Sequence, residues 1–166
     1  MTHKGATYEL LWGKEEGALM SKRQGIVVKA GLFLQIALKY LCPSAEYQVK
    51  VIDPTTGKTM RADMIFLGWA CELKLGFNFD TKKSSKEVEE IKKYANLISS
   101  LRHKDIRPAI CLFQADGIKD LHEFKTDTSG VRMMTGRELC NEIGIKYQDV
   151  LVSIQTAARE DESRDK

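Results

Sequence analysis

The sequence predicts an α/β fold in which one mixed central β-sheet is flanked by helices. A helical pattern of apolar residues at 15–41 precedes three strand-like runs between 47 and 75. A second helical stretch, 82–102, then leads to a short apolar strand at 109–113. This helix is long enough to cross over the sheet and place the 109–113 strand parallel to a neighbour, whereas the earlier runs form an antiparallel meander. The sheet is therefore expected to be mixed.

The first elements are a helical region and a strand. Apolar residues recur with helical spacing over 15–41, with Gly25 and Gly31 as the positions where the region would divide into two helices. Residues 47–52 (YQVKVI) alternate as a strand, and the turn sequence DPTTGK follows. We interpret Asp53 as a turn residue, because Asp and Pro favour such positions without any catalytic role.

The strands at 60–67 and 69–75 are expected to form a hairpin. A loop with an even number of residues, centred on 67–68, places Asp63 opposite Glu72. One face of the hairpin is then apolar and collects Ala62, Met64, Phe66, Trp69, Cys71, Leu73 and Leu75. The other face collects Arg61, Asp63, Ile65, Ala70, Glu72 and Lys74. A single register thus gathers two carboxylates and an amine on one side.

The C-terminal third is expected to hold a strand and two helices. Residues 131–134 form a short apolar run. Thr135 is the predicted N-cap of the next helix, with Glu138 at its third position, and Gly144 ends it. A last helix is expected over about 147–158.

Length and composition favour one domain. The chain has 166 residues, of which 43% are hydrophobic, and this is enough to bury a substantial core. We expect a single domain over 1–158, followed by a charged, disordered tail at 159–166 (REDESRDK). The 26 basic and 23 acidic residues give a net charge of +3, which permits a nucleic-acid partner without indicating one.

The cysteines and the apolar runs bear on the compartment. The four cysteines contain no CxxC pair, so buried reduced thiols are favoured over a zinc site or disulfides. The most hydrophobic run, at 31–41, is too short and too polar to span a bilayer, and the N-terminus lacks a targeting pattern. We therefore expect a cytoplasmic protein without membrane contact.

The charged side of the hairpin suits phosphodiester hydrolysis. Two carboxylates at cross-strand distance repel each other unless a cation lies between them, and Mg²⁺ prefers oxygen ligands. Such an ion would polarise a scissile phosphate and lower the pKa of a bound water. Lys74, two residues after Glu72, points to the same side, where it can orient the water or stabilise the developing charge.

These residues resemble the signature of the PD-(D/E)XK nuclease superfamily. Asp63 is followed, after residues 64–71, by Glu72-Leu73-Lys74 on the adjacent strand. The resemblance implies a restriction-endonuclease-like core. It also implies that Asp63, Glu72 and the backbone carbonyl of Leu73 bind Mg²⁺, for which Mn²⁺ can substitute. Lys74 would be the catalytic lysine, and the products would carry a 5′-phosphate and a 3′-hydroxyl.

Other parts of the chain bear on this resemblance. Many members use a Glu on the helix before the strands, for which Glu16 is the candidate, followed by Glu9. Ala62 stands where many members have Pro. The segments at 76–94 and 133–144 look like those of small type II restriction enzymes.

The sequence thus predicts a Mg²⁺-dependent endonuclease that cuts DNA through metal-activated water, with RNA left open as a substrate. Cleavage of both strands of a duplex needs two sites, which favours a homodimer. Lys82, Lys83 and Lys86 are candidates for contacting nucleic acid, or else the solvated surface of a helix.

Three alternatives remain at this stage. A junction-resolving or repair nuclease would use the same site. A catalytically inactive relative would bind nucleic acid through the same sheet. An unrelated α/β interaction domain would expose the charged side of the hairpin to solvent instead of placing it in a cleft.

Overall fold

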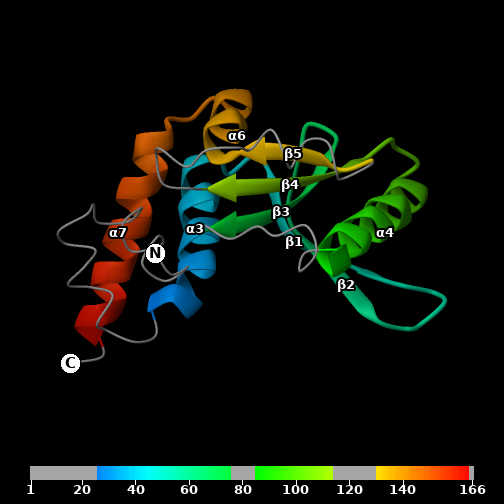
Figure 1. Ribbon diagram of the computed structural model, residues 1–166, viewed down its shortest axis with the longest axis horizontal. Helices are drawn as coiled ribbons and strands as arrows, with labels where there is room; N and C mark the ends of the chain where they lie inside the picture. Colours follow the sequence, from blue (N-terminus) through cyan, green and yellow to red (C-terminus); the bar gives the residue numbers. More distant parts are fainter. Residues whose placement is uncertain (1–25, 76–84, 114–129, 165–166) are drawn as a thin grey trace.

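The computed structural model describes residues 26–75, 85–113 and 130–164 (Figure 1). The strands within these residues are β1 (Glu46–Ile52), β2 (Thr59–Phe66), β3 (Trp69–Leu75), β4 (Arg107–Phe113) and β5 (Arg132–Thr135). The helices are α3 (Ile26–Leu41), α4 (Ser85–Arg102), α6 (Gly136–Ile143) and α7 (Tyr147–Arg164).

The five strands form one mixed sheet in the order β1-β2-β3-β4-β5. The pairs β1–β2 and β2–β3 are antiparallel, whereas β3–β4 and β4–β5 are parallel. Helix α4 makes the crossover that sets β4 parallel to β3. Helices α3 and α7 lie beside each other on one side of the sheet and α4 lies on the other (Figure 1). The predicted α/β class with a mixed central sheet is therefore confirmed.

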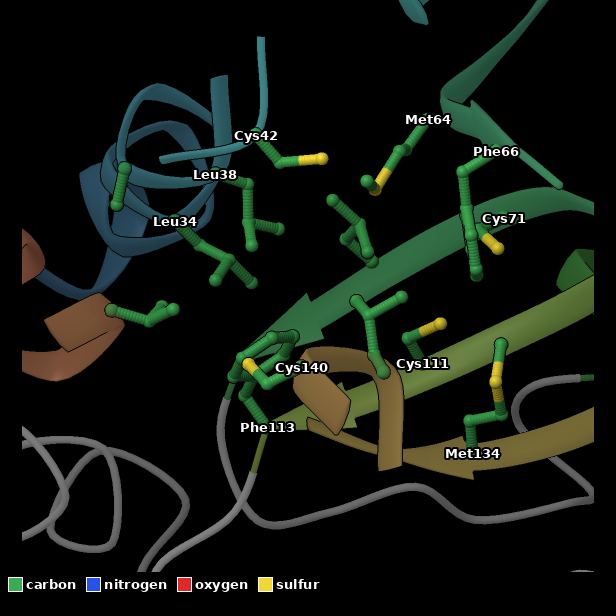
Figure 2. Packing of buried hydrophobic residues seen from close by; sticks show 14 of the residues in the cluster. Leu34, Leu38, Cys42, Met64, Phe66, Cys71, Cys111, Phe113, Met134 and Cys140 are labelled. Atoms are coloured by element: carbon green, nitrogen blue, oxygen red, sulfur yellow. The ribbon is translucent and has the colours of Figure 1, made fainter. Parts of the chain in front are cut away.

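Each side of the sheet has its own apolar core. The first core lies under α3, α6 and α7, and Figure 2 labels ten of its residues: Leu34, Leu38, Cys42, Met64, Phe66, Cys71, Cys111, Phe113, Met134 and Cys140. The second core lies under α4 and contains Val51, Ala62, Ile65, Ala70, Ile91, Tyr94, Ile98, Ile106, Ile110, Leu112, Val131 and Met133. Because β4 is covered on both sides, its sequence is a continuous apolar run instead of an alternating one.

The hairpin between β2 and β3 has the predicted register. Met64 pairs with Cys71 and Phe66 with Trp69, so the loop is Leu67-Gly68. Both loop residues have positive φ, 45° and 80°, as a type I′ turn requires. This two-residue loop fixes which side chains share a face.

The apolar face predicted for the hairpin is only partly correct, because strands β1 and β2 change faces midway. Tyr47 packs against the first core but Val49 packs against the second, although residues two positions apart in a strand normally share a face. Met64 and Ala62 on β2 divide in the same way. Between these positions Gln48 has a left-handed backbone, with φ of 54°, which breaks the regular alternation. Ala62 therefore lies on the α4 side.

The expected limits of helices and strands differ from the structure at three places. Gly31 lies inside α3, so the helix is not divided there, while residues 15–25 lie outside the described residues. Strand β4 begins at Arg107, before the expected residue 109. Helix α7 continues to Arg164, so the segment 159–164, expected to be a disordered tail, is helical. Glu and Arg are good helix formers, and this propensity prevails over the high charge.

The predicted helix cap and the burial of the cysteines are confirmed. The hydroxyl of Thr135 accepts a hydrogen bond from the Glu138 N–H at 3.0 Å, and Gly144 ends α6 with φ of 77°. The four cysteines are buried free thiols. Among the helices of the described segments, none is both long enough and apolar enough to cross a bilayer.

Candidate active site

Asp63 lies on β2 with its side chain buried, 7% exposed. Three N–H groups from three different elements hold its carboxylate. Oδ2 accepts a hydrogen bond from the backbone N–H of Leu73 on β3 at 2.9 Å. Oδ1 accepts from the side-chain amides of Gln35 on α3 and Gln48 on β1, each at 3.2 Å. The orientation of this carboxylate is thus set by the packing of α3, β1 and β3 around β2.

Glu72 and Lys74 occupy alternate positions of β3 and project to the same side. The Lys74 ammonium lies 3.6 Å from Oε1 of Glu72. It also donates a hydrogen bond of 2.8 Å to Oε1 of Glu87, in the first turn of α4. The structure therefore brings together the three residues predicted from the sequence and adds a third carboxylate beside them.

The surroundings of Glu72 favour its protonated form. Burial raises the pKa of Glu72 to about 7, and the negative charges of Asp63 and Glu87 act in the same direction, against the opposing effect of Lys74. For Lys74, burial acts to lower the pKa, but the hydrogen bond to Glu87 and the charges of Glu72 and Glu87 outweigh it, so that the pKa is raised. Lys74 therefore stays an ammonium at neutral pH, while Glu72 lies near its midpoint.

The carboxylates of Asp63 and Glu72 line a cavity of about 430 Å³. Its walls come from the turn between β1 and β2, from β2 and β3, and from α4. The remaining lining residues are Asp53, Thr56, Lys58, Thr59, Met60, Arg61, Glu87, Glu90, Ile91 and Lys93. The charged side of the hairpin thus faces a cleft beneath α4, with a buried carboxylate at its floor.

The donor set of this cavity is compatible with Mg²⁺. Burial raises the pKa of Glu72 and the neighbouring Asp63 carboxylate adds to this effect, so ionising Glu72 is costly, and a divalent cation would offset that cost. Both carboxylates offer hard oxygen ligands. Within the described segments, no group of three or more His, Cys, Asp or Glu side chains converges on a metal position. Mg²⁺ sites in proteins often use one or two carboxylates and keep several waters, and Asp63 and Glu72 would supply two.

Comparison with known proteins finds a similarity to the type II restriction enzyme HhaII of Haemophilus parahaemolyticus. The two sequences are 28% identical over 155 residues, which cover 84% of this chain and 68% of that enzyme. No family model matches the chain, and no solved structure matches it. The chain is thus a distant relative of a type II restriction enzyme, and its mixed sheet with helices on both sides is consistent with a restriction-endonuclease-like core.

Three residues near the site were not predicted from the sequence. Gln35 is a single amide in the apolar sequence GLFLQIAL, and this break in the apolar pattern was the available signal. Gln48 looks like an ordinary outward residue of an alternating strand. Glu87 lies in the charged start of the helical stretch predicted at 82–102, where nothing in the sequence distinguishes it from its neighbours. The candidates Glu16 and Glu9 lie outside the described residues, and the helical contribution that the structure does describe comes from Gln35.

Of the three predicted basic contacts, the structure describes only Lys86. Lys82 and Lys83 lie outside the described residues. The Lys86 side chain is 85% exposed and forms a long ion pair of 3.9 Å with Glu90, one turn later on α4. Lys86 therefore belongs to the solvated surface of α4.

Asp53 is a turn residue, as predicted. Its carboxylate accepts hydrogen bonds from the N–H of Thr55 and the hydroxyl of Thr56, both at 2.9 Å, and pairs with Lys93 of α4 at 2.5 Å. The Lys93 contact, together with the bonds from the turn, lowers the pKa of Asp53 to about 2. Asp53 thereby ties the β1–β2 turn to α4, and both Asp53 and Lys93 line the cavity.

Proposed function

We propose that this protein is a Mg²⁺-dependent endonuclease that hydrolyses phosphodiester bonds in DNA, as a restriction-type member of the PD-(D/E)XK superfamily. The observation that carries the proposal is that Asp63 and Glu72 line one cleft, with the Lys74 ammonium 3.6 Å from Glu72, and that the three residues have the sequence spacing of that superfamily. The similarity to a type II restriction enzyme supports DNA as the substrate.

Asp63 and Glu72, with the backbone carbonyl of Leu73, would hold the Mg²⁺, and Mn²⁺ would take its place. When bound, the ion supplies charge that polarises the scissile phosphate and lowers the pKa of the attacking water. Glu72 must lose its proton to serve as a ligand. Asp63 is presented in a fixed orientation by its three N–H donors, so one ligand is already positioned before the ion arrives.

Lys74 is proposed as the catalytic lysine in a direct attack of water on phosphorus, without a covalent intermediate. Its ammonium lies beside the Glu72 carboxylate, where it would orient the water or stabilise the charge that develops on the phosphate. Glu87 accepts the hydrogen bond that keeps this ammonium in place and charged. Glu87 is thus a positioning residue of the proposed site.

The substrate backbone would enter over the basic part of the cavity rim. Lys58 and Arg61 line the same cavity as the two carboxylates and supply positive charge for phosphate oxygens. A single chain offers one such site, so double-strand cleavage is proposed to require a homodimer. The burial of Asp63 beneath α4 supports an active cleft over an interaction domain with a solvated charged face.

The proposal is tested by incubating wild type, Lys74→Ala and Lys86→Ala with plasmid DNA, branched DNA and RNA, in Mg²⁺ or in EDTA. We expect wild type and Lys86→Ala to cleave plasmid in Mg²⁺ only. Loss of the Lys74 ammonium should lower the rate by about 10²- to 10³-fold. Lys86→Ala is the matched control, because it removes the same charge from an exposed helix surface.

Equal cleavage by wild type and Lys74→Ala would remove Lys74 from the mechanism. Preferential cleavage of branched DNA would replace a restriction-type activity with a junction-resolving one, and preferential cleavage of RNA would replace DNA as the substrate. An absence of cleavage of all three substrates would contradict the enzyme proposal.

A further inference from the structure

We propose that Gln48 is a positioning residue that fixes the Asp63 carboxylate for binding a divalent ion. This inference rests on the proposed nuclease function. It goes beyond it by giving a role to a strand residue that belongs to no part of the nuclease signature. Gln48 combines an unusual backbone with direct contacts to the site.

The backbone of Gln48 has φ of 54°, in the left-handed region that residues with a side chain adopt infrequently. It lies within β1, where neither a turn nor a helix end calls for such a conformation. Unfavourable backbone conformations that persist inside regular structure tend to occur at functional sites. We therefore expect the side chain of Gln48 to make a contact that offsets its unfavourable backbone conformation.

The side chain of Gln48 reaches the predicted metal ligand. Its neighbours Tyr47 and Val49 pair with Met64 and Ala62 of β2, so Gln48 stands opposite Asp63. Its amide nitrogen donates to Oδ1 of Asp63 at 3.2 Å and also contacts Oε1 of Gln35.

The change of faces in β1 and β2 occurs at this same pair of positions. Gln48 and Asp63 are thus the pair of positions at which β1 and β2 pass from one core to the other.

The resulting network limits how Asp63 can move. Gln48 and Gln35 both donate to Oδ1, and the Leu73 N–H donates to Oδ2. A carboxylate has about four lone-pair positions, so these three donors leave about one for the cavity that Asp63 lines. Gln48 also contacts the oxygen of Gln35, which orients the second amide so that its nitrogen faces Asp63. Loss of Gln48 would therefore loosen two of the three bonds to the carboxylate.

Two substitutions separate the role of the amide from that of the backbone. Gln48→Gly removes the amide and accepts the left-handed backbone without strain. Gln48→Met removes the amide but keeps the length of the side chain and the strain. His103→Gly is the matched control, because His103 has φ of 53° and an exposed side chain in the turn after α4, away from the cavity.

The experiment measures Mn²⁺ binding by isothermal titration calorimetry, plasmid cleavage and the thermal midpoint for wild type and the three variants. We expect both Gln48 variants to bind Mn²⁺ about 10- to 100-fold more weakly, as is typical when a hydrogen-bond partner of a metal ligand is removed. Gln48→Gly should keep or raise the thermal midpoint while it loses cleavage. His103→Gly should match wild type in Mn²⁺ affinity and cleavage.

Wild-type Mn²⁺ affinity and cleavage in both Gln48 variants would overturn the role of Gln48 and leave the nuclease proposal in place. A wild-type protein that neither binds Mn²⁺ nor cleaves nucleic acid would instead overturn the nuclease proposal, and the role of Gln48 with it. A lower thermal midpoint in Gln48→Gly, with unchanged Mn²⁺ affinity, would assign Gln48 to the fold alone.

Discussion

At the residue scale, the protonation state of Glu72 is the property of the site that depends most on the neighbouring groups. Burial, the Asp63 carboxylate and Glu87 together place its pKa near 7 instead of the usual value of 4.5. In the proposed site, the protonated form of Glu72 is favoured when no cation is present, and the ionised form would bind the ion. Ion binding and proton release would therefore be coupled at this one side chain.

This coupling predicts the pH dependence of cleavage. Glu72 is protonated below its pKa and ionised above it, so at limiting Mg²⁺ the rate should rise with pH through about 7. A higher Mg²⁺ concentration should move this rise to lower pH, because the ion favours the ionised form. The measurement is the initial cleavage rate from about pH 5.5 to 8.5 at two Mg²⁺ concentrations. A profile that is flat across this range, or insensitive to Mg²⁺, would contradict the assignment of Glu72.

At the element scale, the close contact of α6 with β4 depends on a glycine. A Cβ added at Gly136 would lie 2.5 Å from Cδ1 of Phe113, whose ring is fully buried and stacks on Tyr147 with centroids 5.9 Å apart. Overpacking of this kind costs about 1–3 kcal/mol. Gly31 offers the opposite case, because it lies inside α3 with nothing within 4 Å of an added Cβ.

We therefore expect Gly136→Ala to lower the free energy of unfolding by about 1–3 kcal/mol. Gly31→Ala should raise it by about 0.5–1 kcal/mol, since alanine is the better helix former. Urea denaturation monitored by circular dichroism measures both changes. If the two variants were destabilised equally, the contact between Gly136 and Phe113 would not have the importance assigned to it.

Several elements of the structure were predicted from the sequence, and others were not. The register of the β2–β3 hairpin was predicted, because a two-residue loop and period-two alternation fix which residues face each other. The cap at Thr135 was predicted from short-range chemistry. The change of faces at Gln48 was not, because a positive φ at a residue other than glycine leaves no compositional signal. Local patterns therefore predicted the strands and their pairing, but not the change of faces within β1 and β2.

The contacts that complete the site could likewise not be predicted from the sequence. Gln35 reaches Asp63 across 28 positions and Glu87 reaches Lys74 across 13, and each contact depends on how a helix is placed over the sheet. Periodicity identifies the buried stripe of a helix but not the strand residue that a particular side chain meets. The motif on β2 and β3 was thus found, while the residues that hold it in position required the three-dimensional structure.

At the scale of the whole molecule, the site lies where the two halves of the sheet join. Strand β3 is antiparallel to β2 and parallel to β4, so it is the boundary between the meander and the crossover. Helix α3 covers it on one side and α4 on the other, and each helix sends a polar side chain into the site. Groups from α3, β1, β3 and α4 therefore surround the two carboxylates or line their cavity.

The central claim is that Asp63 and Glu72 share one divalent ion in the cleft beneath α4. The most direct measurement is a crystal structure of the protein grown with Mn²⁺, with anomalous diffraction data to locate the ion. We predict an anomalous peak bonded to carboxylate oxygens of both residues, and no such peak in an Asp63→Asn Glu72→Gln variant. A wild-type crystal of DNA-cleaving protein with Mn²⁺ bound elsewhere, and none between these two side chains, would contradict the account.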